Sequence, residues 1–211
     1  LTATDLEVQI RTHADLQLKD PSESITIAAK KLLDILRSLP ESSEIVLDGK
    51  ESRLTLKAGK SRFSLQTLPA ADFPKLAETG EAVTSFSLNR KTFKAQLEKV
   101  QYAMANQDIR YYLNGMLISV AAGKVTAVAT DGHRLSFAES NMDGGEAKAE
   151  AILPRKTVAE LIKLLDDGDA DSSVNVTLKT NQVRFDLGNT ELSSKLIDGK
   201  FPDYTKVIPT G

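Results

Sequence analysis

Apolar residues recur at helical spacing in three stretches of the chain. In each stretch they occupy positions i, i+4 and i+7, which lie on one face of an amphipathic helix. These positions are Leu32, Leu36 and Leu39 in the first stretch, Phe93, Leu97 and Val100 in the second, and Val158, Ile162 and Leu165 in the third. The spacing predicts helices over residues 28–39, 89–100 and 154–166, each preceded by a short apolar strand.

Alternating apolar and polar residues follow the first and third of these helices, as in strands that bury one face. The pairs Asp48-Gly49 and Gly188-Asn189, together with Gly59, predict tight turns between the strands. Tight turns join antiparallel strands, because parallel pairing needs a long crossover connection. The pattern therefore predicts an α+β protein made of repeated units, in which one helix packs on a few antiparallel strands.

The pattern repeats along the chain. Leu32, Phe93 and Val158 hold the same place in the three helices and are 61 and 65 positions apart, so two units make one domain of 126 residues. The pairs Thr4-Asp5 and Thr130-Asp131 are also 126 positions apart. We expect a first domain over residues 1–79 that lacks its beginning, a second domain over 80–202, and a linker over 203–211 that leads into a third domain.

Composition argues against several kinds of site. The chain has no cysteine and two histidines, so disulfides, thiolate ligands and a His-rich metal site are not expected, and no cofactor is implied. It has no run of 18 apolar residues that could span a membrane. We therefore expect a cytoplasmic protein that does not bind membranes.

The net charge of −2 conceals an uneven distribution. Residues 28–38, 89–100 and 154–163 carry net charges of +2, +3 and +2, which leaves −9 on the rest of the chain. Basic helices on an acidic body suit contact with DNA phosphates, although Lys and Arg are also common on solvated helix faces. No recognition-helix motif is present, so readout of base sequence is not expected. The candidate phosphate contacts are Lys30, Lys91, Lys94 and Lys156.

Four longer strings, at residues 61–74, 107–116, 129–135 and 194–204, resemble one known family. They are similar to bacterial DNA sliding clamps, the beta subunits of DNA polymerase III, and the resemblance runs along the whole chain. In that family, three domains of similar fold form a crescent, and two crescents close head to tail around duplex DNA. The resemblance implies a DNA-clamp fold and a non-catalytic processivity factor that binds double-stranded DNA without sequence preference.

The resemblance also implies a peptide-binding pocket where the second and third domains meet. Replicative polymerase, clamp loader and repair proteins would insert short hydrophobic motifs there. The matching positions are Arg110, Leu113, Thr130, Gly132, His133, Arg134, Leu135, Pro202, Lys206 and Val207. Lys206 stands where the family often has arginine, which keeps the charge but loses the planar guanidinium. Leu113, Leu135, Pro202 and Val207 are expected to converge into an apolar floor beside the Gly132 turn.

Two further sets of contacts are implied by the resemblance. Gln107, Tyr111 and Tyr112 match a protruding loop that touches DNA, and Phe63 and Leu65 match the subunit interface of a homodimeric ring. Without the resemblance, the two tyrosines would be interpreted as half-buried strand aromatics.

A second interpretation uses Asp131, His133 and Arg110 as the site of a small hydrolase or transferase, with the histidine as general base and Asp131 orienting it. No nucleophile motif and no phosphate-binding glycine loop accompany these residues. A shallow apolar pocket would favour the clamp, whereas converging titratable groups with shifted pKa values would favour the enzyme.

Overall fold

The computed structural model describes residues 1–14, 24–50, 52–144 and 148–208. The chain divides into two compact units, Leu1–His13 with Leu76–Gly211, and Ala14–Lys75. The first thirteen residues join the larger unit because β2 (Val8–Thr12) pairs with β15 (Thr190–Lys195). These units group residues that contact one another in space, whereas the predicted domains were divided by the sequence repeat. The predicted domain boundaries therefore stay a prediction.

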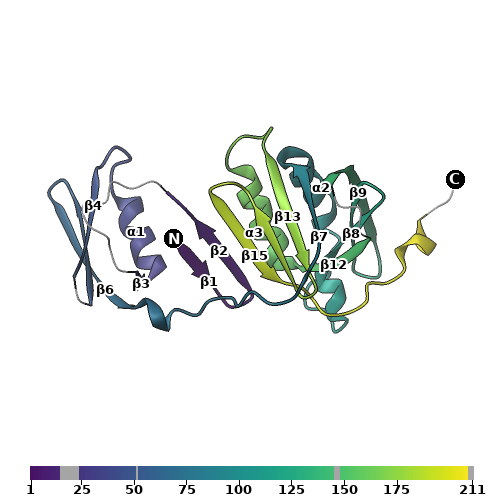
Figure 1. Cartoon of the computed structure of the whole chain (residues 1–211), viewed down its shortest axis with the longest axis horizontal. Coiled ribbons are helices and arrows are strands. Elements are labelled where there is room, and N and C mark those ends of the chain that lie inside the picture. Colours follow the sequence, from purple (N-terminus) through teal and green to yellow (C-terminus); the bar gives the residue numbers. More distant parts are fainter. Residues whose placement is uncertain (15–23, 51, 145–147, 209–211) are drawn as a thin grey trace. The chain divides into compact units, whose positions relative to one another are not determined.

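The larger unit contains two antiparallel sheets and two α-helices, α2 (Arg90–Gln101) and α3 (Arg155–Asp166) (Figure 1). The seven-stranded sheet has the order β1-β2-β15-β14-β13-β7-β11, whose remaining strands are β1 (Thr2–Thr4), β14 (Gln182–Asp186), β13 (Ser173–Lys179), β7 (Ala82–Asn89) and β11 (Asp143–Gly144). The four-stranded sheet has the order β10-β9-β8-β12, with β10 (Leu135–Asn141), β9 (Lys124–Thr130), β8 (Gly115–Ala121) and β12 (Ala149–Pro154). The described residues of this unit also form two short 3-10 helices, η2 (Tyr111–Asn114) and η3 (Tyr204–Val207).

The core of the larger unit lies between its helices and both sheets. The predicted apolar face of α2 is fully buried there, since Phe93, Leu97 and Val100 are each at most 1% exposed. On α3 the buried face is rotated slightly from the prediction, because Leu161 is fully buried and Ile162 only partly. Burial of each such side chain contributes about 1.5–3 kcal/mol, so this face fixes the helices on the sheets.

In the smaller unit, residues 24–50 and 52–75 form a four-stranded antiparallel sheet, of order β3-β6-β5-β4, and an α-helix. Its elements are β3 (Ile25–Ile27), α1 (Ala29–Ser38), β4 (Ile45–Lys50), β5 (Arg53–Ala58), β6 (Ser61–Pro69) and the 3-10 helix η1 (Ala70–Asp72). The helix is where the periodicity predicts it, but none of its residues is buried by the described part of the chain. Leu33 and Leu36 are 45% and 37% exposed.

Most of the predicted elements are confirmed. All three helices lie within one residue of their predicted limits, and the strand pairs are antiparallel. Gly59 and Gly188 lie between paired strands with positive φ angles of 55° and 92°. The predicted turn at Asp48-Gly49 is wrong, because β4 continues to Lys50, which pairs with Arg53. No helix in the described parts of the chain is both long and apolar enough to span a bilayer.

Candidate functional site

A turn with the same hydrogen bonds occurs twice, at Thr4-Asp5 and at Thr130-Asp131. In each copy the threonine hydroxyl accepts a hydrogen bond from the N–H two residues on and donates to the carbonyl four residues on. In each copy aspartate Oδ1 accepts from the N–H groups two and three residues on. The middle residue has a positive φ, 75° at Leu6 and 89° at Gly132. The 126-residue repeat therefore extends to the backbone of the candidate pocket turn.

A loop over residues 105–113 lies next to the second turn. Its two ends are joined by a hydrogen bond from Ala105 N to Leu113 O of 2.9 Å. Within it, the side chain of Asn114 accepts from the N–H of Asp108 and donates to the Asp108 carbonyl, both at 2.9 Å. The side-chain amide of Asn114 thus bonds both backbone groups of Asp108 and restricts the conformation of the loop at that residue.

Arg110 connects this loop to the turn. Its Nε and Nη2 donate to the two carboxylate oxygens of Asp108 at 3.0 and 2.8 Å. Nη2 also donates to the carbonyl of Asp131 at 3.2 Å, and a Cβ added at Gly132 would lie 3.0 Å from Arg110 Nη1. The Arg110 side chain, followed by its backbone N–H, lowers the pKa of Asp108 from 3.8 to about 2, so the pair is ionised at neutral pH.

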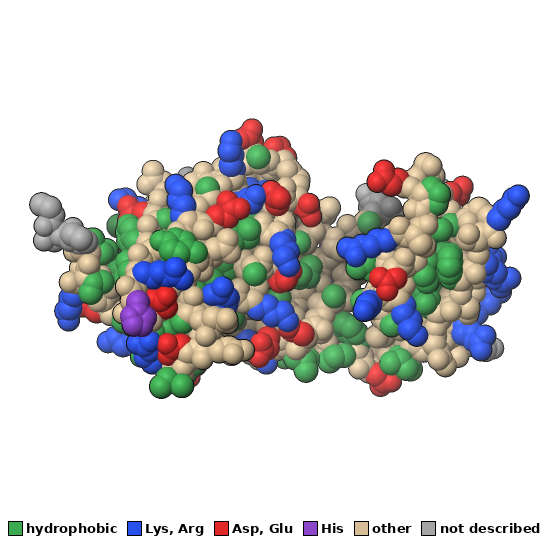
Figure 2. All heavy atoms as spheres, turned by 180° about the vertical axis from the view of Figure 1, so that it is seen from behind, with side chains coloured by type: hydrophobic (Ala, Val, Ile, Leu, Met, Phe, Trp, Pro, Cys, Tyr) green, Lys and Arg blue, Asp and Glu red, His purple; other side chains and the backbone are tan. Residues whose placement is uncertain are grey.

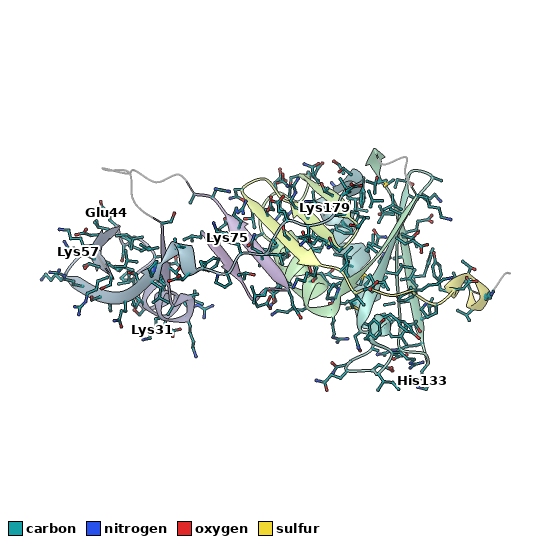
Figure 3. The ribbon with its side chains drawn as sticks, turned by 60° about the horizontal axis from the view of Figure 1, so that its bottom comes forward. Lys31, Glu44, Lys57, Lys75, His133 and Lys179 are labelled. Carbon is teal, nitrogen blue, oxygen red and sulfur yellow. The ribbon has the colours of Figure 1, made fainter. Side chains whose placement is uncertain are left out.

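Arg134 fixes the other side of the turn. Its Nε bonds Asp131 Oδ2 at 3.1 Å, its Nη2 donates to the Tyr102 carbonyl at 2.8 Å, and its guanidinium lies 5.2 Å from the centre of the Tyr102 ring. His133 is exposed at the outer end of the turn (Figure 3). The predicted polar rim of Arg110, His133 and Arg134 is therefore gathered around Gly132, with both arginines held and the histidine facing solvent.

An apolar cluster lies behind this rim. Leu113 is 1% exposed, and Leu135 is partly buried against the same cluster. The cluster consists of Ala105, Leu113, Leu117, Val128, Ile152 and Phe201, with Tyr112, Leu135, Ile197 and Tyr204 packed against it. Pro202 is exposed and Val207 is 66% exposed, so neither joins it. Lys206 is exposed and pairs with Asp203 at 3.2 Å. The convergence of all four predicted floor residues stays a prediction.

The larger unit has two clefts that no residue from Thr130 to Leu135 lines. One, of about 480 Å³, is lined on its apolar side by Leu117, Ile152 and Phe201. The other, of about 440 Å³, lies beside Arg90 and Gly168. Neither cleft is lined by Leu113 or Leu135, but Leu117, Ile152 and Phe201 of the first cleft belong to the same apolar cluster as Leu113.

The candidate DNA-contacting residues of the loop differ in exposure. Gln107 is exposed with a φ of 57°, and Tyr111 is 57% exposed. Tyr112 is partly buried against the apolar cluster, and its ring meets that of Tyr111 edge-on, 5.8 Å between centres. Tyr111 is thus the more accessible of the two rings.

The basic residues of the helices are less free than their count suggests. Lys94 pairs with Asp166 and with Glu98, and Lys156 pairs with Asp5. Lys30 and Lys91 are exposed. Figure 2 shows Lys and Arg interspersed with Asp and Glu over the larger unit, on the left of the view, so the side of that unit seen there carries no unbroken basic patch. The net charge of a helix window therefore overstates the charge available to DNA.

The candidate interface residues lie on β6. Leu65 is 7% exposed and Phe63 is partly buried. Residues Ser61 to Gln66 of this strand pair with β5, whereas the described residues of β3 pair with Thr67, Leu68 and Pro69 on the other edge.

The residues of the catalytic interpretation do not form a catalytic arrangement. Asp131 accepts from the backbone N–H of His133 and then of Arg134, which lowers its pKa, and its second oxygen bonds the Arg134 side chain. Its carboxylate therefore shapes the turn and orients no imidazole. Arg110 is paired with Asp108. Among the described residues, no three His, Cys, Asp or Glu side chains are grouped as metal ligands.

Sequence reasoning missed three residues that hold the site together: Asp108, Asn114 and Arg155. Asp108 accepts from the N–H of Arg110 in an Asx turn, but nothing in the sequence shows that its carboxylate also pairs with the Arg110 side chain or that Asn114 bonds both backbone groups of Asp108. Arg155 donates to the carbonyls of Met104 and Ala105, and its one signal in the sequence is that Arg90 holds the same position in the preceding repeat.

Known proteins resemble the chain over its whole length. Family models described as the N-terminal and central domains of the DNA polymerase III beta subunit match residues 1–77 and 87–203. The beta sliding clamp of Vibrio cholerae serotype O1 is 42% identical over 209 residues, which are 99% of this chain and 56% of that protein.

Solved structures agree with these matches. The DNA polymerase sliding clamp from Pseudomonas aeruginosa with ligand has a TM-score of 0.93 and 41% identity, covering 100% of this chain and 57% of that one. A sliding clamp from the same organism bound to griselimycin has a TM-score of 0.91 and 42% identity, covering 100% and 56%. The predicted DNA-clamp fold is thereby confirmed, and the hydrolase or transferase interpretation is not supported. The chain spans a little more than half the length of these relatives, and it belongs to the DNA polymerase III beta subunit family.

Proposed function

We propose that the protein is a cytoplasmic processivity factor that encircles duplex DNA and tethers the replicative polymerase, clamp loader and repair proteins. The membership of the family carries this proposal, since the relatives are beta sliding clamps. The polar network between the 105–113 loop and the Gly132 turn supports it, because it holds the candidate DNA contacts and the candidate pocket rim in one arrangement.

Partner proteins would bind at the turn through a hydrophobic motif. The exposed rim of Arg110, His133 and Arg134 beside the partly buried Leu135 offers an apolar contact bordered by hydrogen-bond donors, as peptide-anchoring pockets do. A relative has been solved bound to griselimycin. We propose that this compound binds here too and can serve as a probe of the pocket.

A second copy of the protein would complete the ring through β6. In the larger unit the strands β13, β14 and β15 lie side by side, and the sheet continues past β15 because the other edge of β15 pairs with β2. The meander β4-β5-β6 ends in an equivalent strand, and in the described residues the outer edge of β6 from Ser61 to Gln66 has no strand partner. An open edge is a template for pairing with another chain, and Phe63 and Leu65 lie on that stretch.

Binding to DNA is expected to be independent of sequence and sensitive to salt. In a protein of the relatives' full length that contains this sequence, Lys91→Gln should lower the slope of log affinity against log salt by about 0.9, the value for one lost phosphate contact. Lys91 is chosen because its side chain is exposed at the start of α2. Lys156, at the same position of α3, is already paired with Asp5. Fluorescence anisotropy on duplexes of two unrelated sequences measures both effects.

The matched control is Lys124→Gln, which removes a lysine of β9 that pairs with Glu139 at 2.6 Å. This change should leave the salt slope as it is. Equal slopes for the wild type and Lys91→Gln, or affinity that depends on the base sequence, would contradict the phosphate-contact proposal.

A further inference from the structure

Helices α2 and α3 each begin with an arginine that reaches the end of the other helix. Arg90 donates to the carbonyls of Leu164, Leu165 and Asp167, with Nε 3.1 Å from Leu165 O. Arg155 Nη1 donates to Met104 O at 3.0 Å and to Ala105 O at 3.4 Å, just beyond the end of α2. The two contacts are reciprocal, and they join repeat-equivalent residues to opposite helix ends.

The local helix chemistry does not explain these arginines. A cation in the first turn opposes the helix dipole, and neither helix has an acidic residue in its first turn. Carbonyls at a helix end lack donors within the helix, so a guanidinium from the neighbouring helix can satisfy them. In α1 the equivalent position is Ala29. The arginines are therefore placed for the neighbouring helix end and not for their own helix.

The two arginines differ in what they hold. The carbonyls bonded by Arg155 lead directly into the 105–113 loop, whose ends are joined by Ala105 N and Leu113 O. The residue before it, Pro154, pairs with Gly115, just after the other end of the loop. The start of α3 thus contacts both ends of the loop. Arg90 donates instead to carbonyls at the end of α3, none of which belongs to this loop.

We propose that Arg155 is a positioning residue for the 105–113 loop. By fixing the carbonyls at the base of the loop, it keeps Gln107 and Tyr111 presented outward and Arg110 directed at the Gly132 turn. The ligands in this proposal rest on the proposed function, whereas the effect on the loop itself does not. The competing role is direct contact with DNA, since Arg155 remains exposed overall.

Arg90 provides the matched control. It is the repeat equivalent of Arg155 and bonds helix-end carbonyls in the same way, but it is more deeply buried, at 7% exposure. Arg90→Met should therefore cost more stability than Arg155→Met. If loss of stability alone impaired ligand binding, the Arg90 variant would be the worse binder.

The experiment compares Arg155→Met, Arg155→Lys and Arg90→Met in a protein of the relatives' full length. Hydrogen exchange is followed at the loop amides of Ala105, Asp108, Arg110 and Leu113, all of which donate hydrogen bonds. Affinities for griselimycin and for a duplex DNA are measured well below the melting temperatures. Arg155→Met should speed exchange at these amides and weaken both ligands about three- to tenfold. Arg155→Lys should recover part of each effect, because lysine can still donate to one carbonyl.

Arg90→Met should lower the melting temperature most, with loop exchange and both affinities as in the wild type. Faster exchange in Arg155→Met is the deciding result. Unchanged loop exchange overturns the proposal, and a loss of DNA affinity alone would then assign Arg155 to direct DNA contact. The proposal would also be overturned if both methionine variants lost affinity in proportion to their loss of stability. A wild type that binds neither ligand would refute the proposed function, while the exchange data would still decide the role of Arg155.

Discussion

Replacing Leu135 with aspartate is expected to weaken griselimycin binding by about tenfold or more. Leu135 begins β10 and packs, partly buried, against the cluster that contains Leu113. A carboxylate at this position would be placed beside apolar side chains, where the loss of hydration of its charge is unfavourable. Isothermal titration of the wild type and of Leu135→Asp in a protein of the relatives' full length measures the difference.

The control for this substitution is Val83→Asp, which places the same charge at a partly exposed strand position away from the turn; Val83 is 44% exposed on β7. Since Leu135 is partly buried, some loss of stability is expected, and the titrations belong well below both melting temperatures. Equal griselimycin affinities for the folded wild type and Leu135→Asp would place the binding site elsewhere.

The second large effect is expected at Gly115, where β8 starts. A Cβ added there would lie 2.5 Å from the backbone oxygen of Leu153 and 2.8 Å from side-chain carbons of Ile152 and Ile197. The backbone of β12 cannot retreat, because Pro154 and Leu153 are paired with β8. Gly115→Ala should therefore lower the free energy of unfolding by about 3 kcal/mol or more, or prevent folding.

Chemical denaturation of Gly115→Ala against Gly49→Ala tests this expectation. Gly49 is also a strand glycine, but an added Cβ would meet nothing within 4 Å, so its substitution should change stability little. Similar free energies of unfolding for Gly115→Ala and the wild type would contradict this expectation, because they would mean that an alanine side chain fits between β8 and β12.

The sequence predicted the elements whose signal is periodic. The i, i+4, i+7 spacing reports burial directly, so the buried Phe93 and Leu97 located α2 to within a residue. The turn at Asp48-Gly49 failed because a dipeptide preference is local, whereas register is set across the sheet. Leu47 pairs with Leu56, and the ladder continues three residues further.

The charge on the helices could not be assigned from the sequence for a related reason. Lys156 is paired with Asp5, 151 positions away, and no pattern within a helix window shows such a partner. The candidate site was located through the resemblance, which supplied the residues of the turn and of the loop. What joins them, the bonds of Arg110 to Asp108 and to the Asp131 carbonyl, required the structure.

Retention on circular DNA tests encirclement most directly. A protein of the relatives' full length that contains this sequence would be loaded onto a nicked circular plasmid and passed through gel filtration at raised salt. It should remain with the circle, because a closed ring is held by topology after salt has screened its phosphate contacts. Cutting the plasmid once should release it, whatever the plasmid's sequence. Protein that leaves circular and linear DNA at the same rate would contradict the clamp.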